Sequence, residues 1–225
     1  MKTSDLALSR FHNQLIAGDQ PKRPEETVRR MGAIQAQDYL GALWAVGLRT
    51  GNSTQSDVEQ AIASGRIVRM WPMRRTIHIV HRDDARWMHA LMVPRLLENM
   101  GQRGERIWGL TETILERCRN ITARALTGEK RLGRSALYEL MAEEGVDTSE
   151  GRGLHIMARL AHDGLICFGP REGKQPTFVL FDEWVPKGQS MSREESLREL
   201  ALRYFTAHGP AQIADLGWWS GLTQK

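Results

Sequence analysis

Short apolar stripes of helical period dominate the first part of the chain. Residues 4–17 carry leucine, phenylalanine and isoleucine at intervals of three and four behind Ser4, a typical N-cap, and Gly18 follows as a helix end. Comparable stripes predict three further helices, over residues 24–34, 41–46 and 56–63. The pattern therefore predicts four short amphipathic helices at the start of the chain.

The period changes at residue 66. Residues 66–81 are rich in β-branched side chains and are broken by Trp71-Pro72, which is typical of a β-hairpin. Helices followed by a basic two-stranded hairpin make the outline of a winged helix, in which one helix enters a DNA groove and the hairpin touches the backbone. We expect residues 1–80 to form a first such unit.

The same order of elements returns in the next hundred residues. Apolar stripes predict helices over residues 84–96, 110–126, 135–141 and 153–162, with residues 103–106 between the first two. Two β-rich runs, 165–168 and 177–181, flank a glycine-containing turn and predict a second hairpin. This repetition predicts a second winged helix over 81–186.

A third unit begins after a short linker at 186–190. Ser192 and Glu195 form a capping box for a helix that reaches residue 205, and residues 213–219 predict another helix. Residues 191–225 are interpreted as the start of an incomplete winged helix, because neither a recognition helix nor a wing follows. The predicted fold class is α+β, mainly α, with tandem winged-helix units.

Positive charge is concentrated at the front of the chain. Residues 1–80 hold 11 Lys and Arg against 7 Asp and Glu, whereas the rest holds 20 of each, and 25 of the 31 basic residues are Arg. The planar arginine fork suits phosphate oxygens and guanine edges, so the composition favours a polyanionic partner. A GC-rich genome that favours arginine codons is the alternative explanation.

Composition narrows the cellular setting. The chain is 41% apolar and 26% charged, has no apolar run long enough to cross a bilayer, and begins without a secretory signal. Its two cysteines, Cys118 and Cys167, are expected to be reduced thiols. We therefore expect a cytoplasmic protein with no membrane partner.

Two neutral amides stand in the connection after the second predicted helix. Gln35 and Gln37 would point about 200° apart on a helix but to one side of an extended segment, so they converge only where the helix ends. A solvated connector is the usual role of such a segment. Asp38, the next residue, could supply a conventional carboxylate instead.

Several segments together resemble a known family, the AlkZ-like tandem winged-helix DNA glycosylases that excise bulky alkylated bases and unhook interstrand crosslinks. The matching segments are Ile34-Gln35-Ala36-Gln37 with Leu40-Gly41-Ala42-Leu43-Trp44-Ala45, Met73-Arg74-Arg75-Thr76-Ile77-His78-Ile79-Val80, and His208-Gly209-Pro210-Ala211 with Asp215 and Trp219-Ser220-Gly221-Leu222. The resemblance implies a C-shaped array around a DNA channel, with Gln35 and Gln37 as the catalytic pair.

The chain departs from the family pattern at three places. Arg75 stands where the family usually has Gly, and Gln212 stands where it usually has Thr. The third winged helix of the family also continues well beyond Leu222. The resemblance therefore implies a relative that is shortened at its carboxyl end.

The chemistry implied by the resemblance suits amides. A purine alkylated at N7 of guanine or N3 of adenine is cationic and leaves readily through an oxocarbenium-like sugar, so strong acid catalysis is unnecessary. An amide oxygen can accept a hydrogen bond from the attacking water or face the sugar. We expect a metal-free, monofunctional glycosylase without cofactors that is selective for cationic lesions.

Residues of the first hairpin are the expected DNA contacts. Their alternative role is paired surface charge. His78, His81 and Asp83 also suggest metal ligands, but histidines three apart on a strand point to opposite faces, which favours structural roles. Five tryptophans could stack on bases, although the core is the expected place for most of them: Trp44, Trp71, Trp108, Trp218 and Trp219. The expected contacts are Arg66, Arg69, Arg74, Arg75, Thr76 and His78.

Two other functions remain open at this point. A winged-helix DNA-binding protein without chemistry shares the basic first unit, and predicts salt-dependent binding without base release. An array that serves protein association would bind no DNA even at low salt. The first hypothesis expects double-stranded DNA with alkylated bases as partner, a location at the nucleoid, and no obligate protein partner.

Overall fold

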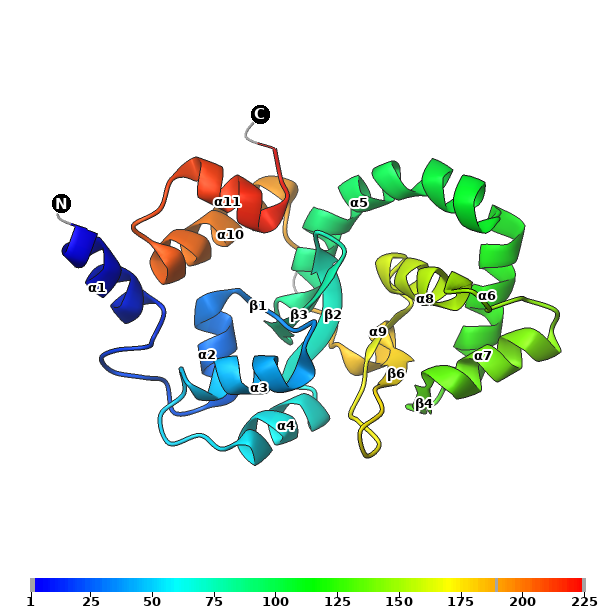
Figure 1. Cartoon of the computed structure of the whole chain (residues 1–225), viewed down its shortest axis with the longest axis horizontal. Helices are drawn as coiled ribbons and strands as arrows, with labels where there is room; N and C mark the ends of the chain where they lie inside the picture. The colour runs from blue at the N-terminus through cyan, green and yellow to red at the C-terminus, as the bar shows by residue number, and fades with distance from the viewer. Residues whose placement is uncertain (1–2, 189, 224–225) are drawn as a thin grey trace.

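The computed structural model describes residues 3–188 and 190–223, and for residues 98–106 it describes the backbone alone. Helices predominate, and a single antiparallel sheet lies at the centre (Figure 1). The elements are α1 (Thr3–Asn13), α2 (Pro24–Met31), β1 (Ala33–Gln35), α3 (Tyr39–Gly47), α4 (Gln55–Ala63), β2 (Ile67–Met73), β3 (Thr76–His81), α5 (Ala85–Trp108), α6 (Glu112–Leu126), β4 (Leu132–Gly133), α7 (Arg134–Glu143), α8 (Arg152–His162), β5 (Ile166–Phe168), β6 (Thr177–Leu180), α9 (Phe181–Trp184), α10 (Arg193–His208) and α11 (Ile213–Ser220).

The predicted fold class is confirmed, with three differences in helix length. Helix α1 ends at Asn13 rather than at residue 17, and Ser4 lies inside it rather than at its N-cap. Helix α2 ends at Met31 rather than residue 34, because Gly32 turns the chain at φ 77° and the following residues pair with β3. Helix α5 continues to Trp108, so that residues 103–106, expected between two helices, lie inside one. The capping box of Ser192 and Glu195 is present at the start of α10.

The two predicted hairpins form one sheet. Strand order is β1-β3-β2-β5-β6-β4, and the first hairpin meets the second through the pairing of Arg69 in β2 with Phe168 in β5. Helices α2 to α4 lie on one side of this junction and α6 to α8 on the other, while α10 and α11 lie above α2 in the view of Figure 1. Both helix-and-hairpin units therefore share a continuous hydrogen-bonded sheet.

Alternate residues of the central strands face two different hydrophobic clusters. Ala36, Ile77 and Ile79 face the cluster packed by α3, α4 and α6 to α8. Val68 and Val80 face the other, which contains residues of α5, α9 and α10. This alternation follows from the pleat of a strand. No helix in the described part of the chain is long and apolar enough to span a bilayer.

His162 on α8 makes the stability of the fold sensitive to acid. Its side chain is 1% exposed and neither ring nitrogen has a hydrogen-bond partner among the described residues. Burial, followed by the nearby His89, lowers the pKa of His162 to about 4. The unfolded chain therefore binds more protons than the folded one between about pH 6.5 and pH 4, and stability falls as the pH drops through that window.

We expect His162→Leu to weaken this acid sensitivity. A leucine removes two buried polar atoms that lack partners, so the variant should be as stable as the wild type or more stable at pH 7.5. Urea unfolding at pH 7.5 and pH 5 measures the difference, and the wild type should lose more free energy of unfolding between the two. An equal loss in both proteins would contradict the assignment to His162.

Candidate functional site

Gln35, Ala36 and Gln37 form an extended edge segment beside β3. Gln35 lies opposite His78, and the Ala36 N–H donates to the Ile77 carbonyl at 2.7 Å. Ala36 is fully buried, whereas the glutamines on either side of it are exposed. Because alternate side chains of an extended segment share a face, both amides project to the solvent side together. The end of α2 at Met31 supplies the geometry that their spacing requires.

The two glutamines differ in their hydrogen bonds. The Gln37 side-chain oxygen Oε1 accepts from the Ile77 N–H at 3.1 Å. A backbone N–H can only donate, so this bond fixes the orientation of the amide and leaves Nε2 as a donor. The side chain of Gln35 makes no hydrogen bond to a residue that the structure describes, although its backbone pairs with His78 in the sheet. One amide is therefore anchored and the other is free to engage a ligand.

Two of the expected DNA contacts, Arg69 and His78, lie in the interior. Arg69 is 8% exposed and donates through Nε and Nη2 to the Ala36 carbonyl, at 3.2 and 3.0 Å. His78 is 1% exposed, and its Nδ1 lies 3.0 Å from the Thr76 carbonyl, which can only accept. Burial at this level removes their polar atoms from the surface that a duplex could touch.

His78 contributes no charge to the site at neutral pH. Burial, together with the positive charge of Arg74, lowers the pKa of His78 to about 4. His81, three residues along β3, lies 3.7 Å from the Asp83 carboxylate. No three His, Cys, Asp or Glu side chains in the described ranges are grouped as metal ligands.

The remaining expected contacts lie at two ends of the first hairpin. Arg66, at its base, is partly exposed and lies 3.8 Å from Glu25. Arg74 and Arg75 form the turn at the tip, and the guanidinium of Arg74 lies 5.4 Å from the ring of Trp218 on α11. The Thr76 hydroxyl donates to the Met73 carbonyl at 3.4 Å within this turn. The structure thus brings together the tip residues and α11, with Arg66 apart from them.

The tip of the hairpin is strained. Arg74 and Arg75 have φ of 51° and 59°, the left-handed region that a two-residue hairpin turn requires and that glycine or asparagine normally occupies. A residue with a Cβ loses about 1 kcal/mol or more in this region. The chain therefore keeps two arginines here at the expense of stability, which is typical of functional positions.

We expect Arg75→Gly to stabilise the protein and weaken its binding to DNA. Relief of the left-handed strain should raise the free energy of unfolding by about 1 kcal/mol, a shift of roughly 2–4 °C in the melting temperature for a chain of this size. Arg75 is one of the phosphate contacts that the sequence predicts, and loss of such a contact should lower the slope of DNA affinity against salt by about 1. Arg75→Ala is the control, because it removes the charge but keeps the strain; equal melting temperatures for the two variants would contradict the prediction.

The sequence pattern did not single out Tyr39 or Arg171. Tyr39 opens α3 two residues after Gln37, and the guanidinium of Arg171, in the loop between β5 and β6, lies 4.3 Å from its ring. Burial, followed by the charge of Glu59, raises the pKa of the Tyr39 hydroxyl. Only the fold brings these residues together, since 132 positions separate them along the chain.

The tryptophans divide between packing and exposure. Trp71 stacks on Phe168 with ring centroids 4.5 Å apart, and Trp108 and Trp219 are also partly buried. Trp44 and Trp218 are the exposed ones, the latter with 78% of its surface accessible. Trp218 is therefore available, together with Arg74, for contact with a ligand.

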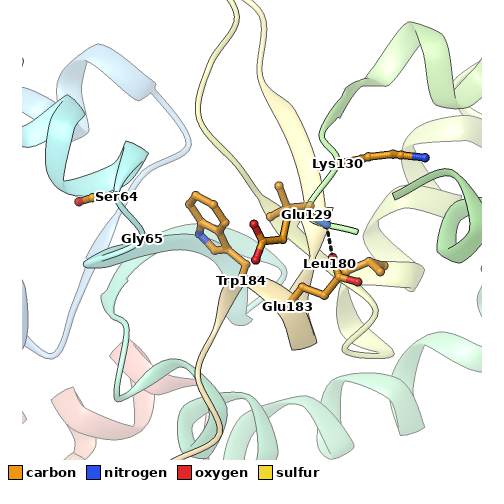
Figure 2. Close-up of a pocket in the computed structure, with 8 residues that line it drawn as sticks. Ser64, Gly65, Glu129, Lys130, Leu180, Glu183 and Trp184 are labelled. Carbon is orange, nitrogen blue, oxygen red and sulfur yellow. Dashed lines mark hydrogen bonds between the residues drawn. The ribbon is translucent and has the colours of Figure 1, made fainter. Parts of the chain in front are cut away.

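A separate pocket lies between the two units and is lined by the end of α4, the segment before β4, and α9. Its volume is about 260 Å³. Figure 2 shows Glu183 and Trp184 of α9 beside Glu129. The Glu183 carboxylate accepts from the backbone N–H groups of Gly128 and Glu129, at 3.1 and 2.6 Å. Because this carboxylate caps a loop and the glutamine pair does not line the pocket, we assign the pocket to packing.

Comparisons with known proteins match almost the whole chain. A family model described as "DNA glycosylase AlkZ-like" matches residues 28–225. The interstrand DNA cross-link repair glycosylase of Streptomyces sahachiroi is 24% identical over 226 residues, which cover 95% of this chain and 59% of the relative. The solved structure of the Streptomyces sahachiroi DNA glycosylase AlkZ superposes with a TM-score of 0.77 at 24% identity, over 100% of this chain and 62% of that one. The chain thus spans about three fifths of the length of these relatives.

Proposed function

The chain belongs to the DNA glycosylase AlkZ-like family, and from this premise we propose that it hydrolyses the N-glycosidic bond of cationic alkylated purines in double-stranded DNA. The observation that carries the proposal is the extended segment at Gln35-Ala36-Gln37, which presents two amides to solvent on one side. Adducts at N7 of guanine and N3 of adenine are the proposed substrates. The reaction needs no metal and no covalent intermediate with the protein.

In the proposed reaction the glutamines organise water. The bond between C1′ and the purine nitrogen breaks with its electron pair on the base, which neutralises the cationic purine. The oxygen of the water adds to the oxocarbenium-like sugar, and its proton passes to solvent. The Oε1 of Gln35 accepts a hydrogen bond from this water. Gln37 donates to the same water through Nε2, because its own Oε1 already accepts from the Ile77 N–H.

Asp38 is less suited to act as the base. A Cβ placed on Gly41 would lie 2.7 Å from Asp38 Oδ2, so this carboxylate lies against the first turn of α3. Asp38 also follows Gln37 directly, and adjacent side chains of an extended segment point to opposite faces. We therefore assign the positioning of the attacking water to the two amides rather than to the Asp38 carboxylate.

The exposure of the glutamine pair suits large lesions. Gln35 and Gln37 lie on the surface, so a bulky adduct can approach them without complete extrusion from the duplex. An interstrand crosslink ties both strands and restricts extrusion, and the relative from Streptomyces sahachiroi is named for crosslink repair. We propose that crosslinks unhooked by release of one purine are among the substrates.

The arginines at the hairpin tip and base hold the DNA in this proposal. Arg74 and Arg75 contact phosphates at the tip, and Arg66 does so at the base. Such contacts release counterions, so affinity should fall steeply with salt. The site of action is then the nucleoid.

Release of free base by the purified chain tests the proposal. A duplex that carries one N7-methylguanine is incubated with the protein in EDTA, and base release and alkali-labile sites are counted. We expect free methylguanine, an abasic strand that breaks only with alkali, and no loss of activity to the chelator. Binding without base release would instead support a non-catalytic winged-helix protein.

A further inference from the structure

We propose that Arg69 is a positioning residue that holds the glutamine pair in its extended geometry and ties that geometry to the second winged-helix unit. Its effect on catalysis rests on the proposed function. Its effect on the geometry of the segment does not, because it concerns hydrogen bonds present in the free protein.

Arg69 is hydrogen-bonded to the backbone between the two glutamines. Its Nε and Nη2 both donate to the Ala36 carbonyl, and the Ala36 N–H donates to the Ile77 carbonyl at 2.7 Å. The Ile77 N–H in turn donates to Gln37 Oε1 at 3.1 Å. The N–H and the carbonyl of Ala36 and the side chain of Gln37 are therefore all hydrogen-bonded to β2 and β3. These bonds set the direction in which both amides project.

The surroundings of Arg69 indicate a specific purpose rather than core filling. Its guanidinium is buried, and no carboxylate among the described residues lies within 4.0 Å of it. Burial, partly offset by Tyr39, lowers its pKa to about 10, so the group stays charged at neutral pH. Burial of an ion without a counter-ion is costly, and an apolar side chain would fill the same volume without that cost. The charge is stabilised by the Ala36 carbonyl and two aromatic faces.

The same guanidinium contacts both units. It lies 4.3 Å from the ring of Phe168 in the second hairpin and 5.6 Å from the ring of Tyr39 beside the glutamine segment. Its Cα is paired with Phe168 where the two hairpins join. Arg171 of the second wing reaches the Tyr39 ring as well, at 4.3 Å. A displacement of the second wing would therefore be transmitted to the glutamine pair.

Arginine is suited to this place by its shape. The planar fork gives two N–H donors to one carbonyl while its face stacks on a ring. Lysine offers a point charge with no plane, so it can replace the hydrogen bond but not the stacking. Methionine keeps much of the length and volume and loses both the charge and the donors.

The test compares Arg69→Met and Arg69→Lys with the control Arg86→Met. Arg86 also donates to backbone carbonyls, those of Pro186 and Val185, and lies 5.2 Å from the ring of Phe181. It pairs in addition with the Asp182 carboxylate, and these partners all belong to the segment 181–186 rather than to the glutamine segment. Three quantities are measured on the full chain: single-turnover base release, the dissociation constant for DNA, and hydrogen exchange of the Ile77 amide.

We expect Arg69→Met to lower base release by about 10–100-fold, because displacement of reacting groups by an ångström costs this much. Its dissociation constant should stay within about threefold of the wild type, since Arg69 makes no surface contact. Exchange of the Ile77 amide should be faster, and Arg69→Lys should lie between the two proteins. Arg86→Met should change neither base release nor exchange at Ile77, even if it lowers stability.

Wild-type base release and wild-type exchange at Ile77 in a folded Arg69→Met or Arg69→Lys protein would overturn the proposal. So would an equal loss in Arg86→Met, which would indicate a general effect on stability. If Arg69→Met does not fold, Arg69→Lys decides. If the wild type releases no base, the proposed function fails, while exchange at Ile77 still decides whether Arg69 positions the segment.

Discussion

Gln35→Ala is expected to lower single-turnover base release by about 10²–10³-fold, the usual cost of losing one prepositioned polar group at a reacting centre. Gln35 is the amide without a hydrogen bond to a described residue, so its oxygen is the one available to the water. The dissociation constant for DNA should stay within about threefold, because the DNA is held by arginines of the hairpin.

Gln37 permits a finer test of the same site. Gln37→Ala removes the acceptor for the Ile77 N–H as well as the outward Nε2 donor. Gln37→Glu keeps an acceptor for Ile77 but replaces the donor by an oxygen. We expect both variants to lose base release to a similar extent if the outward donor is what matters, whereas Gln37→Glu should retain it if the anchor alone matters.

Asp38→Asn is the matched control for both glutamines. It changes a neighbouring carboxylate to an amide with almost no change in volume, and base release should be unaffected. A large loss in Asp38→Asn with undiminished release in the Gln35 and Gln37 variants would transfer the catalytic role to the carboxylate. Single-turnover assays with saturating protein separate these effects from changes in binding.

The second large effect expected is selectivity for the charge of the lesion. A neutral base must be protonated as it leaves, and a general acid typically contributes about 10²–10⁴-fold to such a step. Neither of the two titratable groups next to the glutamines in sequence or register supplies such an acid, because His78 is neutral and buried and the Asp38 carboxylate lies against α3. Release of N7-methylguanine should exceed release of uracil by at least that factor, beyond the difference in uncatalysed rates.

The pH profile provides an independent check of this selectivity. With the pKa of His78 lowered to about 4, that residue does not change its charge near neutrality. Release of the cationic base should therefore be nearly constant from pH 6 to 8.5. Rapid release of uracil, or a rate that rises as the pH falls across this range, would show that an acid takes part. Both lesions are placed in the same duplex sequence and are compared in single turnover with saturating protein, so that differences in affinity do not affect the rates.

Local patterns were sufficient for much of the fold. The β-branched run broken by Trp71-Pro72 predicted the first hairpin, and the capping box at Ser192 predicted the start of α10. Such features depend on residues close together in sequence, and their energies hardly change with the remainder of the fold. The predicted end of α2 was less accurate, because pairing of residues 33–35 with β3 competes with continuation of the helix.

For the site, the sequence by itself determined that two glutamines at positions 35 and 37 can converge only on extended backbone. It placed Arg74 and Arg75 in the first hairpin, but it put the break of that hairpin at Trp71-Pro72, which lies inside β2, whereas the turn is formed by the two arginines. The tertiary structure alone decided that Arg69 is buried and hydrogen-bonded to Ala36, 33 residues away. It also decided that the ring of Phe168, in the second hairpin, packs against the guanidinium of Arg69. Burial and pairing of this kind depend on which distant strands meet, and the period of side chains along one strand carries no information about its neighbour in the sheet.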